Sequence, residues 1–408
     1  MNKHQQSGMT TLLITSMLLI VALLFSLASY KNLFYQIKRT QNEVLARQAH
    51  WAAEGGLECG FAEISNKSDV NTSLDKCKEV IDGQLLTLNI DTDDGKSVLT
   101  SKTTYKIITK TIVAGGARSS GVIKSSNDLY FYGDHEYYSD PGVKLNDGTW
   151  ECVLLRYKKI FYMHDDTETF MTNKGAKENV CNDKYNTDTS SKLLKFDDDV
   201  RLEPSMDIFK ETFNVNREEW IDIRDGDVFN KIDIKNIDSC GSEIASLVNE
   251  DKRHIWATGS CVLTGQGLVD LQKKSYNVGG IFLVIENGVL GFNGSAVDFP
   301  IIIYHFITDF NATSNSWGTL WPHINNTTIF SPSSDKDLTE KDKQKMLNDL
   351  VFYMYGTFIL SGGYIFDTPD KLTYLNAGSS LSYDGKLIND LLAPFGKPTW
   401  QQGSWHDF

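Results

Sequence analysis

The sequence predicts an α+β protein in which one long N-terminal helix precedes a β-rich globular region. Two observations carry this prediction. Residues Met9–Tyr30 contain no charged side chain and no proline, whereas the rest of the chain has only short apolar runs. These later runs are rich in Val, Ile, Thr and Tyr and are separated by Gly, Asn and Asp, which is typical of strands joined by turns. With 40 Lys+Arg, 53 Asp+Glu and a net charge of -13 over 408 residues, the composition is that of a globular protein.

The uncharged segment Met9–Tyr30 is long enough to cross a membrane once. As a helix it would extend about 33 Å, and the hydrocarbon core of a bilayer is about 30 Å thick. A cleaved secretory signal is the alternative, but its apolar region usually ends within about 15 residues at a small-residue cleavage site. Lys31, Lys38 and Arg39 follow the span and only Lys3 precedes it, so charge alone does not favour an exported C-terminal region.

The helical pattern continues beyond the span. Ile37, Val44 and Trp51 repeat every seven residues with charged side chains between them, and no proline occurs before Pro141. This pattern predicts one continuous helix over residues 9–64, apolar all round in its first half and amphipathic in its second.

Two motifs in this helix resemble those of type IV prepilins. Lys3–Gly8, followed by Met9 and an apolar run, resembles the short prepilin leader, and Gln48–Glu58 (QAHWAAEGGLE) resembles the AAEAGL segment of PilX-type minor pilins. The resemblance covers the first seventh of the chain. It implies that residues 1–8 are a leader, that prepilin peptidase cuts between Gly8 and Met9, and that the new N-terminus at Met9 is methylated.

Leu13 departs from the pattern of most pilins. Those proteins carry a glutamate at the fifth position of the mature chain, where it pairs with the N-terminal amine of a neighbouring subunit. An unpaired charge in the bilayer is costly, so a subunit that docks beneath another needs this glutamate, but the first subunit does not. GspK-type tip pseudopilins of type II secretion also lack it. The resemblance therefore implies a tip position, with Leu13, Ile37, Val44 and Trp51 on the assembly helix.

The six cysteines all follow the span and predict disulfides in an exported region. None lies in a CxxC pair and no His/Cys cluster has zinc-site spacing. Six cysteines allow many pairings, and sequence alone does not choose among them. The spacing favours pairing of neighbours in sequence, which would join Cys59 to Cys77, Cys152 to Cys181 and Cys240 to Cys261. Buried free thiols in a cytosolic domain are the alternative.

After the helix we predict three regions: a β-rich domain over residues 65–163, a mixed acidic insertion over 164–255 and a β-rich C-terminal domain over 256–408. Strands of the first region are predicted over Gln84–Ile90, Ser101–Val113, Asp128–Tyr132, Thr149–Tyr157 and Lys159–Met163, with a turn at Asp91–Gly95. The insertion contains one predicted short helix, over Ser242–Val248.

The C-terminal region contains two strand-rich stretches, Gly279–Phe306 and Val351–Gly385. Asn-Gly pairs at 287–288 and 293–294 are interpreted as turns. Thr339 and Asp342 form a capping-box pattern that opens a helix ending at Leu350. Short apolar strands with small turn residues predict a stacked sheet or a β-solenoid, with a β-sandwich as the alternative.

No catalytic motif is present: the chain lacks HExxH, GxSxG, a Walker sequence and a GxGxxG that opens a helix. The acidic run that begins at Asp91 fails as an EF-hand, because its twelfth position is Lys102. His305 lies in an apolar strand and is interpreted as a core residue. Core packing explains most aromatic residues, but Trp317 and Trp321, which flank an Asn/Ser-rich stretch, and the C-terminal WQQGSWHDF are candidates for contact with a glycan or protein. We predict no enzyme activity, no cofactor and no metal.

Together these observations predict a minor pilin at or near the tip of a type IV pilus. It would prime pilus assembly with other minor and major pilins and mediate adhesion or DNA uptake through contact with a surface, a glycan or DNA. The acidic charge argues against direct nucleic-acid binding by this subunit. The chain would span the inner membrane once, with its C-terminal region periplasmic, and then enter the extracellular pilus. The alternatives are a GspK-like tip pseudopilin and a membrane-anchored periplasmic β-solenoid that binds or cleaves glycans.

Overall fold

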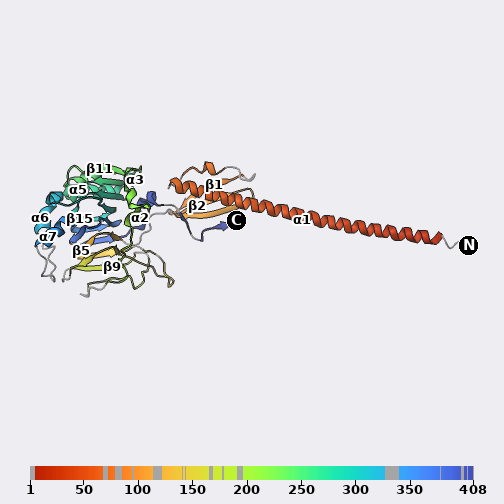
Figure 1. The fold of residues 1–408 in the computed structure, drawn as a ribbon, viewed down its shortest axis with the longest axis horizontal. Coiled ribbons are helices and arrows are strands. Elements are labelled where there is room, and N and C mark those ends of the chain that lie inside the picture. Colours follow the sequence, from red (N-terminus) through yellow and green to blue (C-terminus); the bar gives the residue numbers. More distant parts are fainter. Residues whose placement is uncertain are drawn as a thin grey trace. The chain divides into compact units, whose positions relative to one another are not determined.

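The computed structural model places the chain in two compact units. It describes residues 5–67, 72–78, 85–93, 96–113, 122–139, 141–142, 144–164, 169–176, 179–190, 196–326, 340–376, 378–396, 399–401 and 403–407. The N-terminal unit comprises Met1–Ala114 and Pro398–Phe408, and the central unit comprises Gly115–Lys397. The fold is α+β, with one long N-terminal helix and β-rich sheet regions, as predicted (Figure 1).

Helix α1 (Gln5–Lys67) is continuous through 63 residues. Its second part packs on the antiparallel strands β1 (Thr87–Asp93), β2 (Lys96–Lys102) and β3 (Ile107–Val113). The short strands β21 (Thr399–Trp400) and β22 (His406–Asp407) pair with β3. Before β1 the chain makes the single turn η1 (Asp75–Cys77).

The prediction of one strand over Ser101–Val113 was wrong. The backbone N–H of Thr103 donates to the carbonyl of Lys106 over 2.8 Å, and this turn separates β2 from β3. The predicted turn at Asp91–Gly95 includes residues 94–95, which lie outside the described part of the chain.

The central unit is inserted between two paired strands of the N-terminal unit. We call the sheet of β1, β2, β3, β21 and β22 the small sheet. Val113, the last residue of β3, is the register partner of Thr399, the first residue of β21, so the chain leaves and re-enters the small sheet at one place. The chain therefore divides at 114/115 and 397/398, and not at the predicted boundaries after 163 and 255. Local composition could not reveal this, because the strands that close the N-terminal unit are the last residues of the chain.

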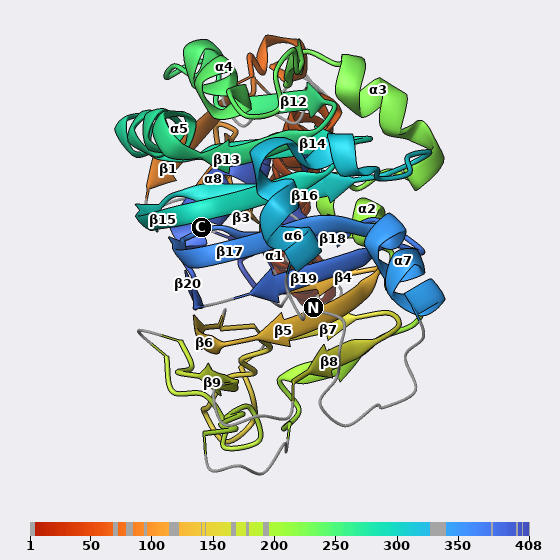
Figure 2. The same ribbon diagram turned by 90° about the vertical axis from the view of Figure 1, so that its left-hand side faces the viewer.

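Parallel strands build the central unit, and their described parts form two sheets; Figure 2 shows the strands stacked one above another, from β12 at the top to β9 at the bottom. The 8-stranded sheet has the order β10 (Val200–Leu202), β7 (Leu155–Tyr157), β4 (Ile123–Ser125), β18 (Gly363–Asp367), β16 (Ile301–Phe306), β14 (Ile281–Glu286), β12 (His254–Thr258) and β11 (Asn230–Asp233). The 9-stranded sheet has the order β8 (Phe161–Met163), β5 (Asp128–Tyr132), β19 (Leu372–Asn376), β17 (Leu350–Leu360), β20 (Ser379–Ser382), β6 (Asp134–Tyr138) and β9 (Phe170–Asn173); β15 (Leu290–Phe299) pairs with β17, and β13 (Cys261–Thr264) with β15.

The chain alternates between the two sheets, as in β14 to β15, β16 to β17 and β18 to β19. The main hydrophobic core lies between their facing surfaces and includes Leu283, Ile303, Phe292 and Met354. A second core lies on the other side of the 8-stranded sheet. Every residue of β14 and β16 is therefore buried, which explains why IFLVIE and IIIYHF are continuous apolar runs without alternation.

Helices cover both outer surfaces of the central unit. The 8-stranded sheet is covered by residues of α2 (Ile208–Phe213), η2 (Arg217–Glu219), α3 (Trp220–Asp225), α8 (Gly385–Leu392) and η4 (Ala393–Phe395). The 9-stranded sheet contacts η3 (Ser314–Leu320), α6 (Trp321–Asn326) and α7 (Glu340–Asp349). α4 (Cys240–Leu247) and α5 (Gly265–Asn277) pack together beside β13.

Several local predictions are settled by these elements. The predicted helix over Ser242–Val248 is α4, and the predicted C-terminal helix is α7, although Thr339 lies outside the described residues. The region 164–255 is not a separate insertion, because its strands join both sheets. The predicted strand Thr149–Tyr157 shortens to β7, and the Asn-Gly pair at 293–294 lies inside β15.

Three disulfides join neighbours in sequence. Cys59–Cys77 ties α1 to η1 in the N-terminal unit. Cys152–Cys181 and Cys240–Cys261 lie in the central unit, where the second pair is fully buried and links α4 to β13. This is the pairing that the spacing favoured. In the chain-entropy model each crosslink contributes about 3 kcal/mol of stability.

We predict that the central unit loses stability in mild acid, because two of its histidines are buried. Burial lowers the pKa of His135 and His305 to about 4, from 6.5. Between these two pKa values the histidines are protonated in the unfolded chain but neutral in the folded chain. The free energy of unfolding is therefore highest above about pH 6.5 and falls by about 3 kcal/mol per histidine as the pH drops to 4. We expect the urea midpoint to fall between pH 7 and pH 4.5.

A variant with both histidines replaced by glutamine isolates this effect. The pKa values of Asp199 and Asp367 are raised by burial and act in the opposite direction, but both proteins share them. The double variant should therefore lose less stability over the same pH range. An identical decline in the two proteins would refute the assignment.

Candidate assembly surface on the N-terminal helix

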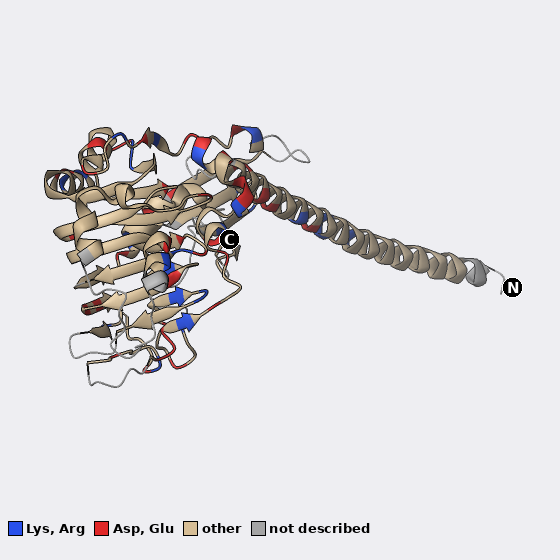
Figure 3. Cartoon of the chain, turned by 60° about the vertical axis from the view of Figure 1, so that its left-hand side comes forward, with Lys and Arg blue, Asp and Glu red and all other residues tan. Residues whose placement is uncertain are grey.

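The first part of α1 is an unburied apolar surface. Every residue from Met9 to Arg47 is exposed, including large side chains such as Leu13, Phe25 and Ile37. Within the described residues this is the one helix long and apolar enough to cross a membrane, by length and composition. The N-terminal half of the helix carries almost no charge in Figure 3.

The three residues predicted at seven-residue spacing lie on one side of α1. Ile37 and Val44 are each 48% exposed and Trp51 is 68% exposed. Seven residues nearly complete two helical turns, so these side chains follow one another with a drift of about 20° per repeat. We call Ile37, Val44 and Trp51 the heptad stripe.

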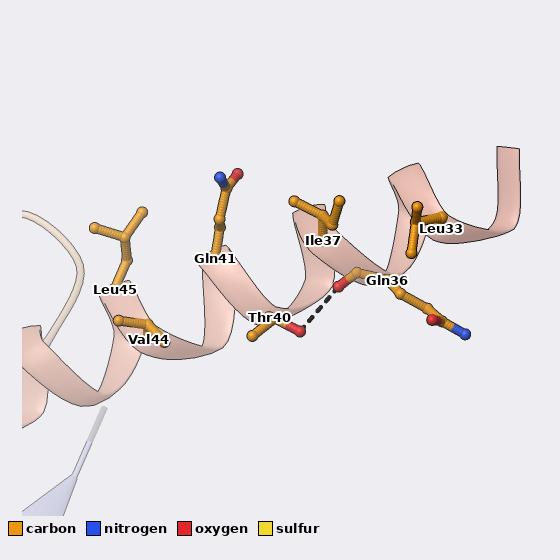
Figure 4. Close-up of a pocket in the computed structure, with 7 residues that line it drawn as sticks. All are labelled: Leu33, Gln36, Ile37, Thr40, Gln41, Val44 and Leu45. Atoms are coloured by element: carbon orange, nitrogen blue, oxygen red, sulfur yellow. Dashed lines mark hydrogen bonds between the residues drawn. The ribbon is translucent and has the colours of Figure 1, made fainter. Parts of the chain in front are cut away.

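Further apolar side chains adjoin the heptad stripe. In Figure 4, Ile37, Gln41 and Leu45 point to the same side of the helix, as expected for residues four apart, and Leu33 lies one turn before Ile37. Thr40 turns its hydroxyl back to the carbonyl of Gln36 over 2.9 Å, which hides one polar group from a partner. The result is an apolar surface of Leu, Ile and Val side chains against which a second helix could pack.

The structure places the other predicted residues of this segment near the start of α1. The Gly8–Met9 bond lies within the helix, and Met9 and Leu13 are 75% and 57% exposed. Met9 lies four seven-residue repeats before Ile37, so the drift places it about 80° from Ile37 around the helix, and Leu13 lies about 120° from Ile37. The structure thus brings Ile37, Val44 and Trp51 into one surface and leaves Met9 and Leu13 on the uncharged part.

Charge changes sign along the second half of α1. Lys31, Lys38, Arg39 and Arg47 come first, and Arg47 forms an exposed ion pair with Glu43. Acidic side chains follow where the helix meets the sheet, and one of them, Glu58, pairs with Lys110 of β3 over 2.8 Å. The heptad stripe crosses the basic part and ends at the sheet.

The AAEGGLE motif has a structural role that the sequence did not reveal. Ala52, Ala53 and Gly56 are buried against the small sheet. A Cβ atom on Gly56 would lie 2.7 Å from Ser101 Oγ, and one on Gly60 would lie 3.1 Å from Leu99 Cδ2. Small residues at this spacing therefore let α1 approach the strands closely. The three- and four-residue spacing of small residues was the available signal.

The C-terminal aromatic residues belong to the same unit. Trp400 stacks on Phe61 of α1 at 4.3 Å between ring centroids, and Lys110 Nζ lies 4.9 Å from the Trp400 ring. Trp405 is 44% exposed and meets His50 edge to face. The suspected WQQGSWHDF segment thus contributes packing through Trp400, and Trp405 is the more exposed of its two tryptophans.

Buried carboxylates elsewhere are tied into the fold. Asp367 accepts a hydrogen bond from the Tyr304 hydroxyl over 3.0 Å and pairs with Arg217 at 3.0 Å. Burial raises the pKa of Asp367, and Arg217 opposes that rise. Glu286 accepts a hydrogen bond from Trp256 Nε1 over 2.7 Å. Among the described residues there is no cluster of His, Cys, Asp or Glu able to hold a metal ion.

No protein-family model, curated protein or solved structure matches this chain.

Proposed function

We propose that the protein is a minor pilin of the PilX type, placed at or near the tip of a type IV pilus. The leader of residues 1–8 would be removed after Gly8 and Met9 methylated. Residues 9–30 would hold the subunit in the inner membrane with its C-terminal region periplasmic. On assembly, α1 would leave the membrane and pack among the helices of other minor and major pilins.

The observation that carries this proposal is the two-part character of α1. A single helix of 63 residues is exposed and apolar at one end and docked on a small sheet through small residues at the other. Exposed Leu, Ile and Phe side chains favour a nonaqueous environment, because burying each of them is favourable by about 1.5–3 kcal/mol. The bilayer would supply this environment before assembly, and the bundle of pilin helices would supply it in the fibre.

The inserted central unit supports a tip position. We interpret its alternating parallel strands as a β-solenoid with covering helices. The unit comprises residues 115–397, more than twice the length of the rest of the chain, and both of its connections leave one site on the small sheet. A body of this size fits the end of a fibre, where no subunit follows on top. There it would contact a surface or a glycan.

A GspK-like tip pseudopilin of type II secretion is the second candidate, favoured by Leu13 in place of the glutamate. It uses the same helix and the same processing, so the host's assembly genes separate the two. A membrane-anchored periplasmic β-solenoid that binds glycans is the third, favoured by the parallel sheets alone. It requires no cleavage after Gly8.

Replacing Gly8 tests the proposal against that third candidate. We expect Gly8→Val to block cleavage and leave the full-length chain in the membrane, because prepilin peptidase needs glycine before the cut. The matched variant Ser7→Val adds the same side chain one residue earlier and should be cleaved. The measurement is the N-terminal peptide mass of each protein. Normal cleavage of Gly8→Val, or no cleavage of the wild type, would overturn the pilin assignment.

A further inference from the structure

The segment that follows β16 presents three alternate polar side chains to solvent. From Asp309 to Thr313 the residues alternate: Asp309, Asn311 and Thr313 are exposed, Phe310 is half-buried and Ala312 is buried. Alternate side chains of an extended segment point to opposite sides. Phe310 and Ala312 pack on the core formed around Trp317 and Leu320, so the three polar residues face solvent together.

Asn311-Ala312-Thr313 matches the acceptor pattern for N-linked glycans, Asn-x-Ser/Thr. The Asn311 side chain accepts a hydrogen bond from Lys371 Nζ through Oδ1, over 2.9 Å. Its Nδ2 atom donates no hydrogen bond among the described residues. The atom that would carry a glycan is therefore exposed and unengaged.

The surroundings of Asn311 also suit modification of a folded chain. The segment belongs to no helix or strand, so its backbone is not held in a sheet. It starts from a fixed point, because Ile307 donates to the Asp367 carbonyl and Thr308 and Asp309 donate to Asn287 Oδ1. Asp309 adds an exposed carboxylate two residues before the acceptor.

One other acceptor pattern lies wholly within the described residues. Asn293-Gly294-Ser295 is part of β15, where its backbone is paired with β17. Such a residue cannot leave the sheet to reach an enzyme without breaking the ladder. Further patterns begin at Asn66, Asn71, Asn325 and Asn326, and each includes residues outside the described ranges.

We propose that Asn311 is an N-glycosylation site. The donor is an oligosaccharide linked through pyrophosphate to a membrane lipid, and a membrane glycosyltransferase joins the two. Nδ2 forms a bond to the anomeric carbon, the bond from that carbon to the pyrophosphate oxygen breaks, and the lipid pyrophosphate leaves. One amide proton passes to a base of the transferase. The Thr313 hydroxyl is the second recognition element.

Peptide mass spectrometry of the full-length protein from the cells that make it tests this site. Proteolysis should separate Asn311 from Asn293 and Asn325. We expect the wild type and Thr313→Ser to carry a glycan mass on Asn311. Asn311→Gln and Thr313→Ala should lose it, and both proteins should migrate faster in a gel. An unmodified Asn311 in the wild type, or a glycan that persists in Thr313→Ala, overturns the inference.

The inference rests on the exported placement in the proposed function, and the same peptide map tests that placement. Without reductant, the map reports whether Cys152–Cys181 and Cys240–Cys261 are linked. Linked cysteines with an unmodified Asn311 overturn the glycosylation site alone. Free cysteines with an unmodified Asn311 overturn the exported placement as well.

Discussion

Val44→Asp is expected to remove the protein from pili while leaving its level in the membrane unchanged. Val44 is exposed in the single chain, so the substitution breaks no contact of the fold. In the proposed fibre the aspartate would lie in an apolar interface, where an unpaired charge costs at least about 3 kcal/mol. That cost corresponds to about a hundredfold loss of incorporation. The measurement is the ratio of the protein in sheared fibres to that in membranes.

Asn42→Asp is the matched control for this variant. It adds the same charge two residues earlier, which is about 200° around the helix from Val44. Asn42 is exposed and does not belong to the heptad stripe. We expect near-normal incorporation of Asn42→Asp. Equal loss in the two variants would show that charge alone, and not the heptad stripe, blocks entry into the fibre.

Gly356→Ala should destabilise the central unit by about 4 kcal/mol. Gly356 in β17 pairs in register with Gly294 in β15, and both have positive φ angles, 131° and 138°. A Cβ atom on Gly356 would lie 1.8 Å from the carbonyl oxygen of Gly294. Backbone strain and overpacking each cost about 1–3 kcal/mol. Urea unfolding followed by tryptophan fluorescence would report the loss.

Gly279→Ala separates strain from steric clash. Gly279 also has a positive φ, 71°, but a Cβ atom there meets no other atom within 4 Å. This variant should lose about 1 kcal/mol, the cost of the backbone conformation. If both variants lost the same stability, the close approach of β15 and β17 at Gly294 and Gly356 would be contradicted.

The elements that sequence predicted well are those with a strong local signal. A long uncharged segment followed by a seven-residue repeat indicates a continuous helix, and α1 spans the predicted range. Asp128–Tyr132 was predicted with the bounds of β5, because three successive aromatic residues lie between the turn-forming residues Asn127 and Gly133. The cysteine pairs followed from spacing because each loop they close is short.

The misses have two causes, which are contact between distant residues and a weak local signal. The pairing of Thr399 with Val113, which returns the chain to its first sheet, leaves no trace in local composition. The strands β9–β12 were missed because charged loops separate them and because each strand is short. Gly294 was interpreted as a turn residue, although its role is a close approach to Gly356.

The candidate surface was predicted in part. Ile37, Val44 and Trp51 could be selected because a seven-residue period places them on one side of a helix whatever surrounds it. The burial of Ala52, Ala53 and Gly56 on the opposite side depends on the small sheet, which includes strands from the chain's end. The sequence therefore indicated the exposed side of α1 better than its docked side.

Mass spectrometry of the N-terminus tests the central claim most directly. The protein would be recovered from sheared surface fibres and from membranes, and its first peptide measured in both. The proposal predicts a methylated peptide that begins at Met9, present in the fibres at low abundance. An intact N-terminus that begins at Met1 and is confined to the membrane would contradict it and favour an anchored β-protein.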